Sequence, residues 1–283
     1  MHRFLVTGAG GQLGMEFVKE FERRGMDFLA VSHKELDISD FQKTYAFIKE
    51  VRPEIIINCA AYNDVDKAET EVLNAHKSNA LGAYNLAIAA SEAGAFLVHY
   101  STDYVFDGSK GSVYEEGDAP NPLNEYGKSK LLGELYIDDV LDERLVFRTS
   151  WVYGVGERNF IRRLLKWGEQ SDRLNVACDE VSVPTSTKTI VDLTLRALDT
   201  GISGLYHLVN SGYCSRYDWA ELVLERLGIK KELHPVSKDV FNLPAKRPSF
   251  SAMSNRKIKE VLCIEIPEWR EELEAFLSSH SIA

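Results

Sequence analysis

A glycine-rich segment near the start of the chain gives the strongest indication of the fold: Thr7-Gly8-Ala9-Gly10-Gly11-Gln12-Leu13-Gly14. It follows the apolar run Phe4–Thr7, which predicts a buried strand, and it opens Leu13–Arg24, where apolar residues recur at helical spacing. Glycines at 8, 11 and 14 allow a tight turn, close approach of backbone N–H groups to a pyrophosphate, and close helix–strand packing. Because the loop lies between a strand and an amphipathic helix, it predicts a dinucleotide site rather than a ligand-free turn.

Strand and helix patterns alternate through the first half of the chain. The expected strands are Phe4–Thr7, Phe28–Val31, Ile55–Cys59, Phe96–Ser101 and Arg144–Ser150. The expected helices are Leu13–Arg24, Phe41–Val51, Val72–Ala93 and Tyr126–Tyr136. This alternation predicts an α/β fold, a Rossmann-like doubly wound parallel sheet with helices on both faces.

The second half has a weaker rhythm and predicts a smaller, mixed α/β substrate-binding lobe. Its short helices are expected at Phe160–Gly168, Tyr217–Leu227 and Trp269–Leu277, among loops rich in Pro, Ser and Arg. Ile190–Leu198 still has the pattern of a sheet-covering helix. We therefore expect an NAD(P)-binding domain of residues 1–150, with about 182–210 returning to it, and a lobe of residues 151–181 and 211–283.

Composition excludes several classes of function. The 283 residues carry 33 basic and 43 acidic side chains, a net charge of −10, which argues against nucleic acid or an anionic membrane as the partner. There is no apolar run of the roughly 20 residues that a membrane helix needs, and no signal peptide. The four cysteines are scattered and no His/Cys cluster has metal-ligand spacing. We expect a soluble, reduced, cytoplasmic protein without a metal.

A Thr–Tyr–Lys set predicts ketone reduction. Thr102 closes a buried strand, and Tyr126 and Lys130 stand four residues apart, so they share one face of a helix. Tyrosine is a poor acid–base group near neutral pH unless a cation favours its ionised form, and Lys130 can supply that cation and hold the nicotinamide ribose. Thr102 would hydrogen-bond the substrate oxygen as an alkoxide develops. By itself the pair could be an ordinary solvated one, while Lys128 faces elsewhere.

The end of the second strand bears on the choice of cofactor. It reads Ser32-His33-Lys34, with no carboxylate before Glu35, whereas an NAD-selective site places an acidic residue near Ser32. Hydroxyl and cationic groups suit a 2′-phosphate, so we expect NADPH, with NADH as a substitute; the alternative is that His33 and Lys34 are solvated loop residues.

Two further stretches lie at the carboxyl ends of neighbouring strands. The small residues of Cys59-Ala60-Ala61-Tyr62 would let a cofactor pass close to the backbone. Asp37-Ile38 is the other stretch, and Asp37 could also be a helix N-cap with Ser39. The full expected cofactor set is Gly8, Gly10, Gly11, Gln12, Leu13, Ser32, His33, Lys34, Asp37, Ile38, Cys59, Ala60, Ala61, Tyr62, Tyr126 and Lys130.

In combination these motifs resemble the extended short-chain dehydrogenase/reductase family and, within it, the dTDP-4-dehydrorhamnose reductases. The resemblance spans about residues 3–280. It rests on Gly11-Gln12-Leu13-Gly14, Ala60-Ala61-Tyr62-x-x-Val65-Asp66-x-Ala68-Glu69, Ser101-Thr102-Asp103-Tyr104-Val105-Phe106-Asp107-Gly108, Pro122-Leu123-Asn124-x-Tyr126-Gly127-x-Ser129-Lys130, Arg148-Thr149-Ser150-Trp151-Val152-Tyr153-Gly154, Asn159-Phe160, Val183-Pro184-Thr185 and Arg247-Pro248.

The resemblance implies hydride transfer from NAD(P)H to the C4 ketone of dTDP-4-dehydro-β-L-rhamnose, a dTDP-linked 4-keto-6-deoxysugar, to give dTDP-L-rhamnose. It implies that Tyr126 delivers the proton, Lys130 tunes it and Thr102 orients the ketone. Trp151 would stack near the sugar, and Arg247 would meet the substrate pyrophosphate. The implied substrate-binding set is Thr102, Asp103, Val105, Trp151, Asn159 and Arg247.

One departure from the family bears on assembly. Some members dimerise through magnesium held by glutamates, one of which follows the Pro-Thr motif. In this chain Pro184-Thr185 leads to Lys188, whose charge would repel Mg²⁺, and Glu16 alone is a solvated helix carboxylate. We expect a monomer or a metal-independent dimer.

Other activities on the same scaffold have to be weighed. Related dehydratases carry Asp-Glu after the catalytic Thr, and Asp103-Tyr104 lacks that glutamate, which argues against dehydration. Epimerisation of a nucleotide sugar, or reduction of another NDP-4-ketosugar, stays open. A regulatory subunit of methionine adenosyltransferase also resembles these reductases, but the intact Thr102–Tyr126–Lys130 set argues against a purely non-catalytic role.

Overall fold

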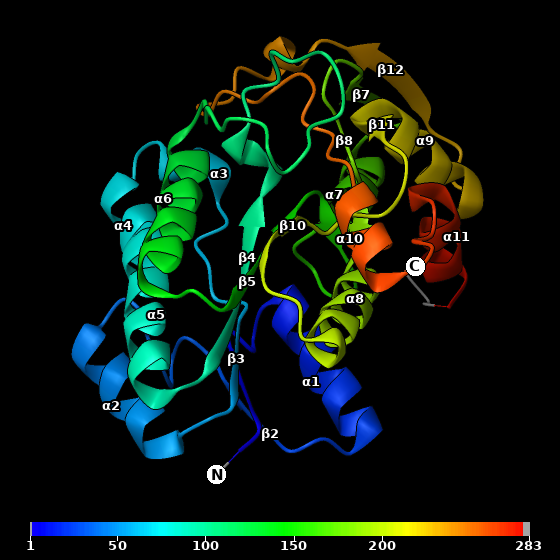
Figure 1. Ribbon diagram of the computed structural model, residues 1–283. Coiled ribbons are helices and arrows are strands. Elements are labelled where there is room, and N and C mark those ends of the chain that lie inside the picture. The colour runs from blue at the N-terminus through cyan, green and yellow to red at the C-terminus, as the bar shows by residue number, and fades with distance from the viewer. Residues whose placement is uncertain (1, 280–283) are drawn as a thin grey trace.

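Six parallel strands form the central sheet of the computed structural model, which describes residues 2–279 (Figure 1). Their order is β2-β1-β3-β4-β5-β10. The strands are β1 (Phe4–Thr7), β2 (Phe28–Val31), β3 (Ile55–Asn58), β4 (Phe96–Thr102), β5 (Arg144–Thr149) and β10 (Gly204–His207). The predicted α/β fold with a doubly wound parallel sheet is confirmed.

Helices cover both faces of the sheet, as the alternating pattern predicted. On one face α1 (Gln12–Arg24) and α8 (Thr187–Thr200) pack together; α2 (Phe41–Val51), α5 (Gly82–Ala93) and α6 (Glu125–Val140) cover the other (Figure 1). Alternation along β1 explains the two cores, because Phe4 and Val6 enter the first and Leu5 enters the second.

The expected helix Val72–Ala93 is interrupted. It consists of α4 (Val72–His76), a π-helical turn (Lys77–Leu81) and α5. The turn contains the buried Asn79, whose amide donates to the Tyr62 carbonyl at 3.0 Å and to the Ser129 hydroxyl at 2.9 Å. The π turn therefore joins the loop after β3 to helix α6.

The second half returns to the sheet before it forms the rest of the lobe. Strand β10 pairs in parallel with β5, and α8 contributes Ile190 to the same core as Phe17 of α1. The domain boundaries themselves stay a prediction. The lobe elements are β6 (Val152–Tyr153), α7 (Phe160–Gln170), β7 (Arg173–Ala177), β8 (Val181–Ser182), β9 (Thr185–Ser186), β11 (Cys214–Ser215), α9 (Arg216–Arg226), β12 (Glu232–Val236), α10 (Arg256–Leu262) and α11 (Trp269–Ser279).

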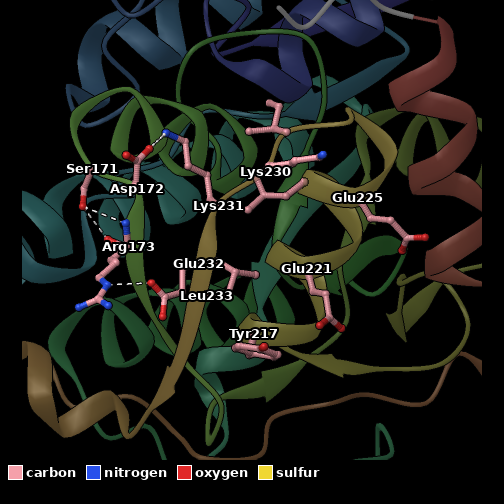
Figure 2. Close-up of a pocket in the computed structure, with 12 residues that line it drawn as sticks. Ser171, Asp172, Arg173, Tyr217, Glu221, Glu225, Lys230, Lys231, Glu232 and Leu233 are labelled. Carbon is pink, nitrogen blue, oxygen red and sulfur yellow. Dashed lines mark hydrogen bonds and ion pairs between the residues drawn. The ribbon is translucent and has the colours of Figure 1, made fainter.

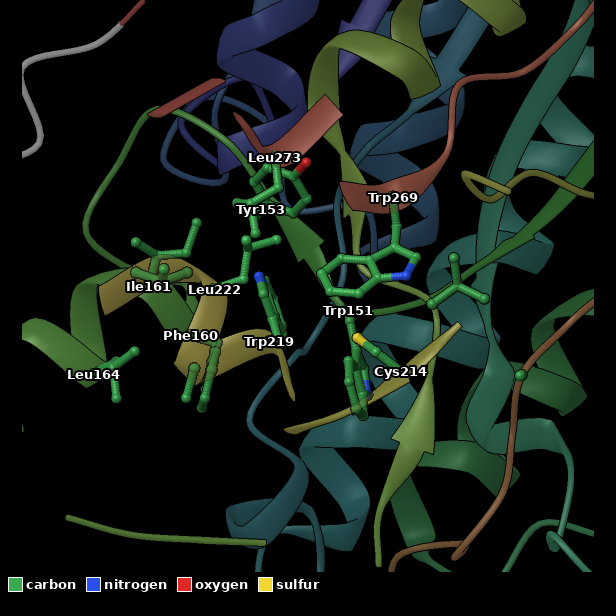
Figure 3. Close-up of a cluster of buried hydrophobic side chains, with 14 of the residues drawn as sticks. Trp151, Tyr153, Phe160, Ile161, Leu164, Cys214, Trp219, Leu222, Trp269 and Leu273 are labelled. Atoms are coloured by element: carbon green, nitrogen blue, oxygen red, sulfur yellow. The ribbon is translucent and has the colours of Figure 1, made fainter. Parts of the chain in front are cut away.

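The lobe has its own core, centred on the fully buried Trp219 (Figure 3). Phe160 of α7 and Tyr153 of β6 pack against this indole, with ring centroids 4.7 and 5.8 Å away. Within residues 2–279, no helix is both long and apolar enough to cross a bilayer.

A buried ion pair holds α6 against the sheet. Arg148 of β5 donates from Nη2 to Glu134 of α6 at 2.6 Å and from Nε at 3.0 and 3.2 Å. Only 4% and 8% of the two side chains is exposed. Because burial removes the hydration of both charges, either group left alone would be costly.

We expect Arg148→Met to lower the free energy of unfolding by about 3–5 kcal/mol, since Glu134 would lose its buried partner. The double variant Arg148→Met/Glu134→Leu should lose much less than the sum of the single variants. Urea unfolding of the four proteins measures the coupling. Additive losses would show that the pair does not act as a unit.

Candidate functional site

The glycine loop lies at the point where the strand order reverses. Strands β2 and β3 flank β1 on opposite sides, so the loops after β1 and β3 diverge above a crevice, where open α/β sheets bind ligands. Gly8 has φ +68°, and a Cβ there would lie 2.5 Å from the Ala60 nitrogen. A Cβ on Gly14 would lie 2.4 Å from the Gly8 carbonyl oxygen. Both glycines are therefore needed for this close packing.

The start of α1 fits the diphosphate of a dinucleotide. Its N-cap is Gly11, which has no side chain to hydrogen-bond the first-turn amides. A Cβ on Gly10 would meet nothing nearer than the Ser32 Cβ at 4.0 Å, so the loop is open on that side. Free amides at a helix N-terminus favour an anion. The residues present thus suit an NAD(P) cofactor, which the glycine loop would hold.

The predicted ribose end of the site is partly acidic. Glu35 accepts hydrogen bonds from the Ser32 backbone N–H and hydroxyl, both at 2.8 Å. The hydrogen bond from the backbone N–H lowers the pKa of Glu35. His33 is 79% exposed and lies 3.8 Å from an Asp37 oxygen. Lys34 is also exposed. The Glu35 carboxylate therefore lies beside Ser32, although Glu35 comes three residues later in the sequence and was not expected to reach it.

The Asp37-Ile38 stretch is bound into the fold. Asp37 accepts from the Ser39 amide at 3.0 Å and from its hydroxyl, whereas the N-cap of α2 is Asp40; the N-cap interpretation of Asp37 is wrong. The Ile38 side chain is 3% exposed and packs in the core against α5. This packing leaves only the backbone of Ile38 for a cofactor.

The loop after β3 is held by two asparagines. Asn58 accepts a hydrogen bond from the Ala60 amide at 3.1 Å, and Asn79 accepts one from the Tyr62 amide at 2.8 Å. Cys59, Ala60, Ala61 and Tyr62 are all partly exposed. Sequence analysis did not predict a role for Asn79, because no sequence pattern in this segment indicates a π turn.

Tyr126 and Thr102 meet at the carboxyl end of β4. Burial raises the pKa of Tyr126 to about 12, a shift that the nearby Thr102 hydroxyl opposes. Tyr126 also packs edge-on against Tyr104, with centroids 6.0 Å apart. A Cβ on Gly127 would lie 2.2 Å from the Tyr104 carbonyl oxygen, so glycine at this position lets α6 lie directly on the turn after β4.

Lys130 is buried on the same helix but has other partners. Its Nζ donates to the Tyr100 carbonyl at 2.5 Å and lies 3.3 Å from His99 Nε2. Burial lowers the pKa of Lys130 to about 8. Lys128, by contrast, is half-exposed and pairs with Glu125 at 2.7 Å, as expected for a residue facing away. The Lys130 amine thus contacts β4 at Tyr100, which precedes Thr102 by two residues.

Asp103 joins the sheet to the lobe. Its carboxylate accepts from Ser251 at 2.6 Å, from Ser182 at 2.8 Å and from Thr102 at 3.2 Å. Burial raises the pKa of Asp103 to about 6, while these hydroxyls oppose the shift. Because three hydroxyl groups fix its carboxylate, Asp103 orients Thr102. The sequence predicted that Asp103 binds substrate and did not predict this orienting role.

Two other predicted substrate residues are packed inside the protein. Val105 is fully buried in the lobe core. Trp151 is 8% exposed, with its ring parallel to Trp219 and 3.6 Å from the Arg216 guanidinium, so stacking on a sugar is not supported (Figure 3). Burial of Val105 likewise leaves no side-chain surface for substrate.

Asn159 caps α7 and ties the lobe to the glycine loop. Its oxygen accepts from the Arg162 amide at 3.1 Å, and its nitrogen donates to Gln12 Oε1 at 2.9 Å and to two loop carbonyls. Gln12 in turn donates to the Val152 carbonyl at 3.2 Å. These hydrogen bonds give Asn159 a positioning role. They also occupy the side chain of Gln12, so that only the backbone of Gln12 could contact a cofactor. Leu13 packs partly against the core.

An arginine cluster forms beside this site. Arg247 is paired with Asp66 at 2.8 and 3.0 Å, and Arg216 with Glu180 at 3.3 Å. Partial burial and the like charges of Arg216 and Arg247 lower the pKa of Arg163. Among residues 2–279 the Arg163 guanidinium has no ion-pair partner. Sequence analysis missed Arg163 and Arg216, which no motif distinguishes from surface arginines.

Glu16 of α1, which was expected not to bind magnesium, is hydrogen-bonded to α8. Glu16 accepts from the Thr187 hydroxyl at 3.0 Å, so it is not the simple solvated carboxylate that was expected. The part of the chain that the structure describes contains no group of three or more His, Cys, Asp or Glu side chains that could hold a metal ion.

A surface hollow between β7, β12 and α9 lies outside this site (Figure 2). Four of its charged residues form two ion pairs, Lys231 with Asp172 at 2.8 Å and Arg173 with Glu232 at 2.7 Å. None of the predicted site residues lines it.

Comparison with known proteins agrees with this geometry. The spore coat polysaccharide biosynthesis protein SpsK of Bacillus subtilis is 37% identical over 283 residues, covering 100% of this chain and 99% of that protein. The dTDP-4-dehydrorhamnose reductase of Salmonella typhimurium is 36% identical, covering 94% and 93%. The crystal structure of dTDP-4-dehydrorhamnose reductase from Bacillus anthracis, in complex with NADP, has a TM-score of 0.95 at 34% identity and covers 99% of each chain.

The family match extends over nearly the whole sequence. The RmlD substrate binding domain family matches residues 1–282, and the resemblance to dTDP-4-dehydrorhamnose reductases of the extended short-chain dehydrogenase/reductase fold is confirmed. The chain belongs to the RmlD substrate binding domain family.

Proposed function

We propose that this protein reduces the C4 ketone of dTDP-4-dehydro-β-L-rhamnose to dTDP-L-rhamnose, using NADPH, with NADH as a substitute. The observation that carries the proposal is the placement of Tyr126 beside Thr102, where α6 packs on the turn after β4, on the sheet edge that carries the open glycine loop. The Salmonella relative has that printed activity, and the Bacillus anthracis relative was crystallised with NADP.

The pair suits proton delivery to a ketone oxygen. Because the pKa of Tyr126 is raised to about 12, mainly by burial, its phenol is protonated near neutral pH and can act as the acid. The single hydroxyl hydrogen of Thr102 is directed at Asp103 at 3.2 Å, and by turning to the ketone oxygen it would donate to that oxygen as it gains negative charge. When bound, the cofactor supplies the hydride. Lys130 would hold the nicotinamide ribose.

The arginine cluster suits the diphosphate of the substrate. The protein carries a net charge of −10, so an anion is attracted only where cations gather. Arg163 has no ion-pair partner among residues 2–279, and the charge of Arg247 reaches it. Guanidinium groups offer several donors in a planar fork to phosphate oxygens. We assign the substrate diphosphate to Arg163 and Arg247, with Asp66 orienting Arg247.

A carboxylate base for dehydration or epimerisation is not provided by Asp103. Both of its oxygens accept hydrogen bonds from hydroxyl groups of the protein, so neither oxygen is free to take a proton from a substrate carbon. This favours net reduction over an activity that regenerates its cofactor.

Tyr126→Phe should lower kcat for ketone-dependent NADPH oxidation about 10²- to 10⁴-fold, because the proton donor is lost while the ring remains. NADPH binding, measured by fluorescence titration, should stay within a few-fold of the wild type. Unchanged turnover would reject the catalytic role of the phenol.

Lys130→Met and Lys128→Met form a matched pair, two residues apart on α6. We expect Lys130→Met to weaken NADPH binding and to reduce kcat by at least about 10²-fold, since the buried amine is lost. Lys128→Met should change both by less than about 2-fold, because an exposed ion pair contributes little. Steady-state kinetics decides, and equal losses in both variants would contradict the assignment.

Arg163→Leu should raise KM for the dTDP-sugar about 10-fold or more and leave kcat nearly unchanged, because a charge-assisted contact to the diphosphate is lost. Arg162→Leu, the adjacent position on α7, removes a side chain that pairs with Glu157 and serves as control. A KM equal in the two variants would exclude Arg163 from the substrate site.

A further inference from the structure

His99 is a buried titratable residue that the proposed mechanism leaves unused. It lies on β4, is 1% exposed, and has a partner at each ring nitrogen. Nδ1 lies 2.9 Å from the Asn58 side-chain nitrogen, and Nε2 lies 3.3 Å from Lys130 Nζ. Asn58 of β3, His99 of β4 and Lys130 of α6 therefore form a continuous chain of polar contacts.

The orientation of the Asn58 amide follows from its other contacts. The Asn58 oxygen faces the Ala60 backbone N–H at 3.1 Å, and the Thr7 hydroxyl at 2.8 Å. A backbone N–H can only donate, so the atom that faces it must be the oxygen. The Asn58 NH₂ group is therefore the one that points at His99, and it donates to Nδ1.

This donation determines the tautomer of His99. Burial and the charge of Lys130 both lower the pKa of His99 well below its ordinary value, so the ring is neutral and carries one N–H. Because Nδ1 accepts from Asn58, the proton is on Nε2, directed at Lys130 Nζ. An ammonium group has three donors and no acceptor, whereas a neutral amine has a lone pair that can accept.

We infer that Asn58 and His99 are positioning residues that present Lys130 with a hydrogen-bond donor, favour its neutral amine in the cofactor-free protein, and thereby couple cofactor binding to uptake of a proton by Lys130. The coupling rests on the proposed function, while the tautomer does not. The proton moves from solvent to Nζ, forming an N–H bond there, and no other bond changes.

The surroundings of Lys130 support this coupling. Burial lowers its pKa to about 8, and the Glu134 carboxylate opposes this shift. Glu134 is engaged by Arg148, and burial raises the pKa of Cys59, so neither supplies a free anion. Among residues 2–279, the groups within hydrogen-bonding distance of Nζ are the Tyr100 carbonyl and neutral His99. The negative diphosphate of a bound cofactor would favour the charged form.

The tautomer can be read directly by NMR of the cofactor-free protein labelled with ¹⁵N in the histidine rings. The His99 signals are those absent from His99→Gln or, if that variant does not fold, from His99→Asn. We expect a protonated Nε2 and an unprotonated Nδ1. A proton on Nδ1 would overturn the inference, because Nε2 would then accept from an ammonium group.

The coupling can be measured by calorimetry of NADPH binding near pH 9 in buffers of different ionisation enthalpy. Since this pH lies above the lowered pKa of Lys130, the wild type should take up close to one proton per NADPH bound. In His99→Gln the amide oxygen can face Nζ and stabilise the ammonium beforehand, so uptake should fall towards zero while binding persists.

Lys130→Met serves as a second variant and should also show no proton uptake in excess of buffer effects. Equal uptake in the wild type and His99→Gln, or none in the wild type, would overturn the inference. Failure of the wild type to bind NADPH at all would instead contradict the proposed function.

Discussion

Direct contact between the backbone of α6 and the turn after β4 is the constraint on which the site depends. Glycine at 127 allows this contact, since any Cβ there would meet the Tyr104 carbonyl oxygen at 2.2 Å. The approach brings Tyr126 to Thr102 and lets the Lys130 amine reach the Tyr100 carbonyl. The buried Arg148–Glu134 pair holds the same helix to β5. A small residue and a buried ion pair therefore set the geometry of the reacting groups.

The two halves of the chain share apolar cores, and polar contacts join them as well. Asp103 binds Ser182 and Ser251 of the second half, and Asn159 binds Gln12 of the glycine loop. Directional hydrogen bonds fix the position of one part relative to the other more narrowly than apolar contact does. Thr102 is hydrogen-bonded to Asp103, so the same joint that aligns the lobe also aligns a group predicted to touch the substrate.

Much of the fold could be predicted from sequence because its signals are local. Phe4–Thr7 and Phe41–Val51 have the predicted bounds, since apolar periodicity and the flanking Gly and Pro define them. The π turn around Asn79 could not be predicted, because its cause is a set of contacts with residues far away in sequence. Trp151 and Val105 were assigned to substrate from motif position, but both side chains are buried in the lobe core. Arg163 was missed because its environment depends on Arg216 and Arg247, which tertiary structure brings near.

The central claim is that the phenol of Tyr126 and the hydroxyl of Thr102 serve the reduction of one particular ketosugar. The most direct measurement follows NADPH oxidation by the wild-type protein on the product of a coupled dTDP-glucose dehydratase and 3,5-epimerase, beside a panel of other nucleotide-linked 4-ketosugars. We expect stoichiometric NADPH loss with formation of dTDP-L-rhamnose, and much slower loss on the panel. No net oxidation with that substrate, or a faster reaction with another ketosugar, would contradict it.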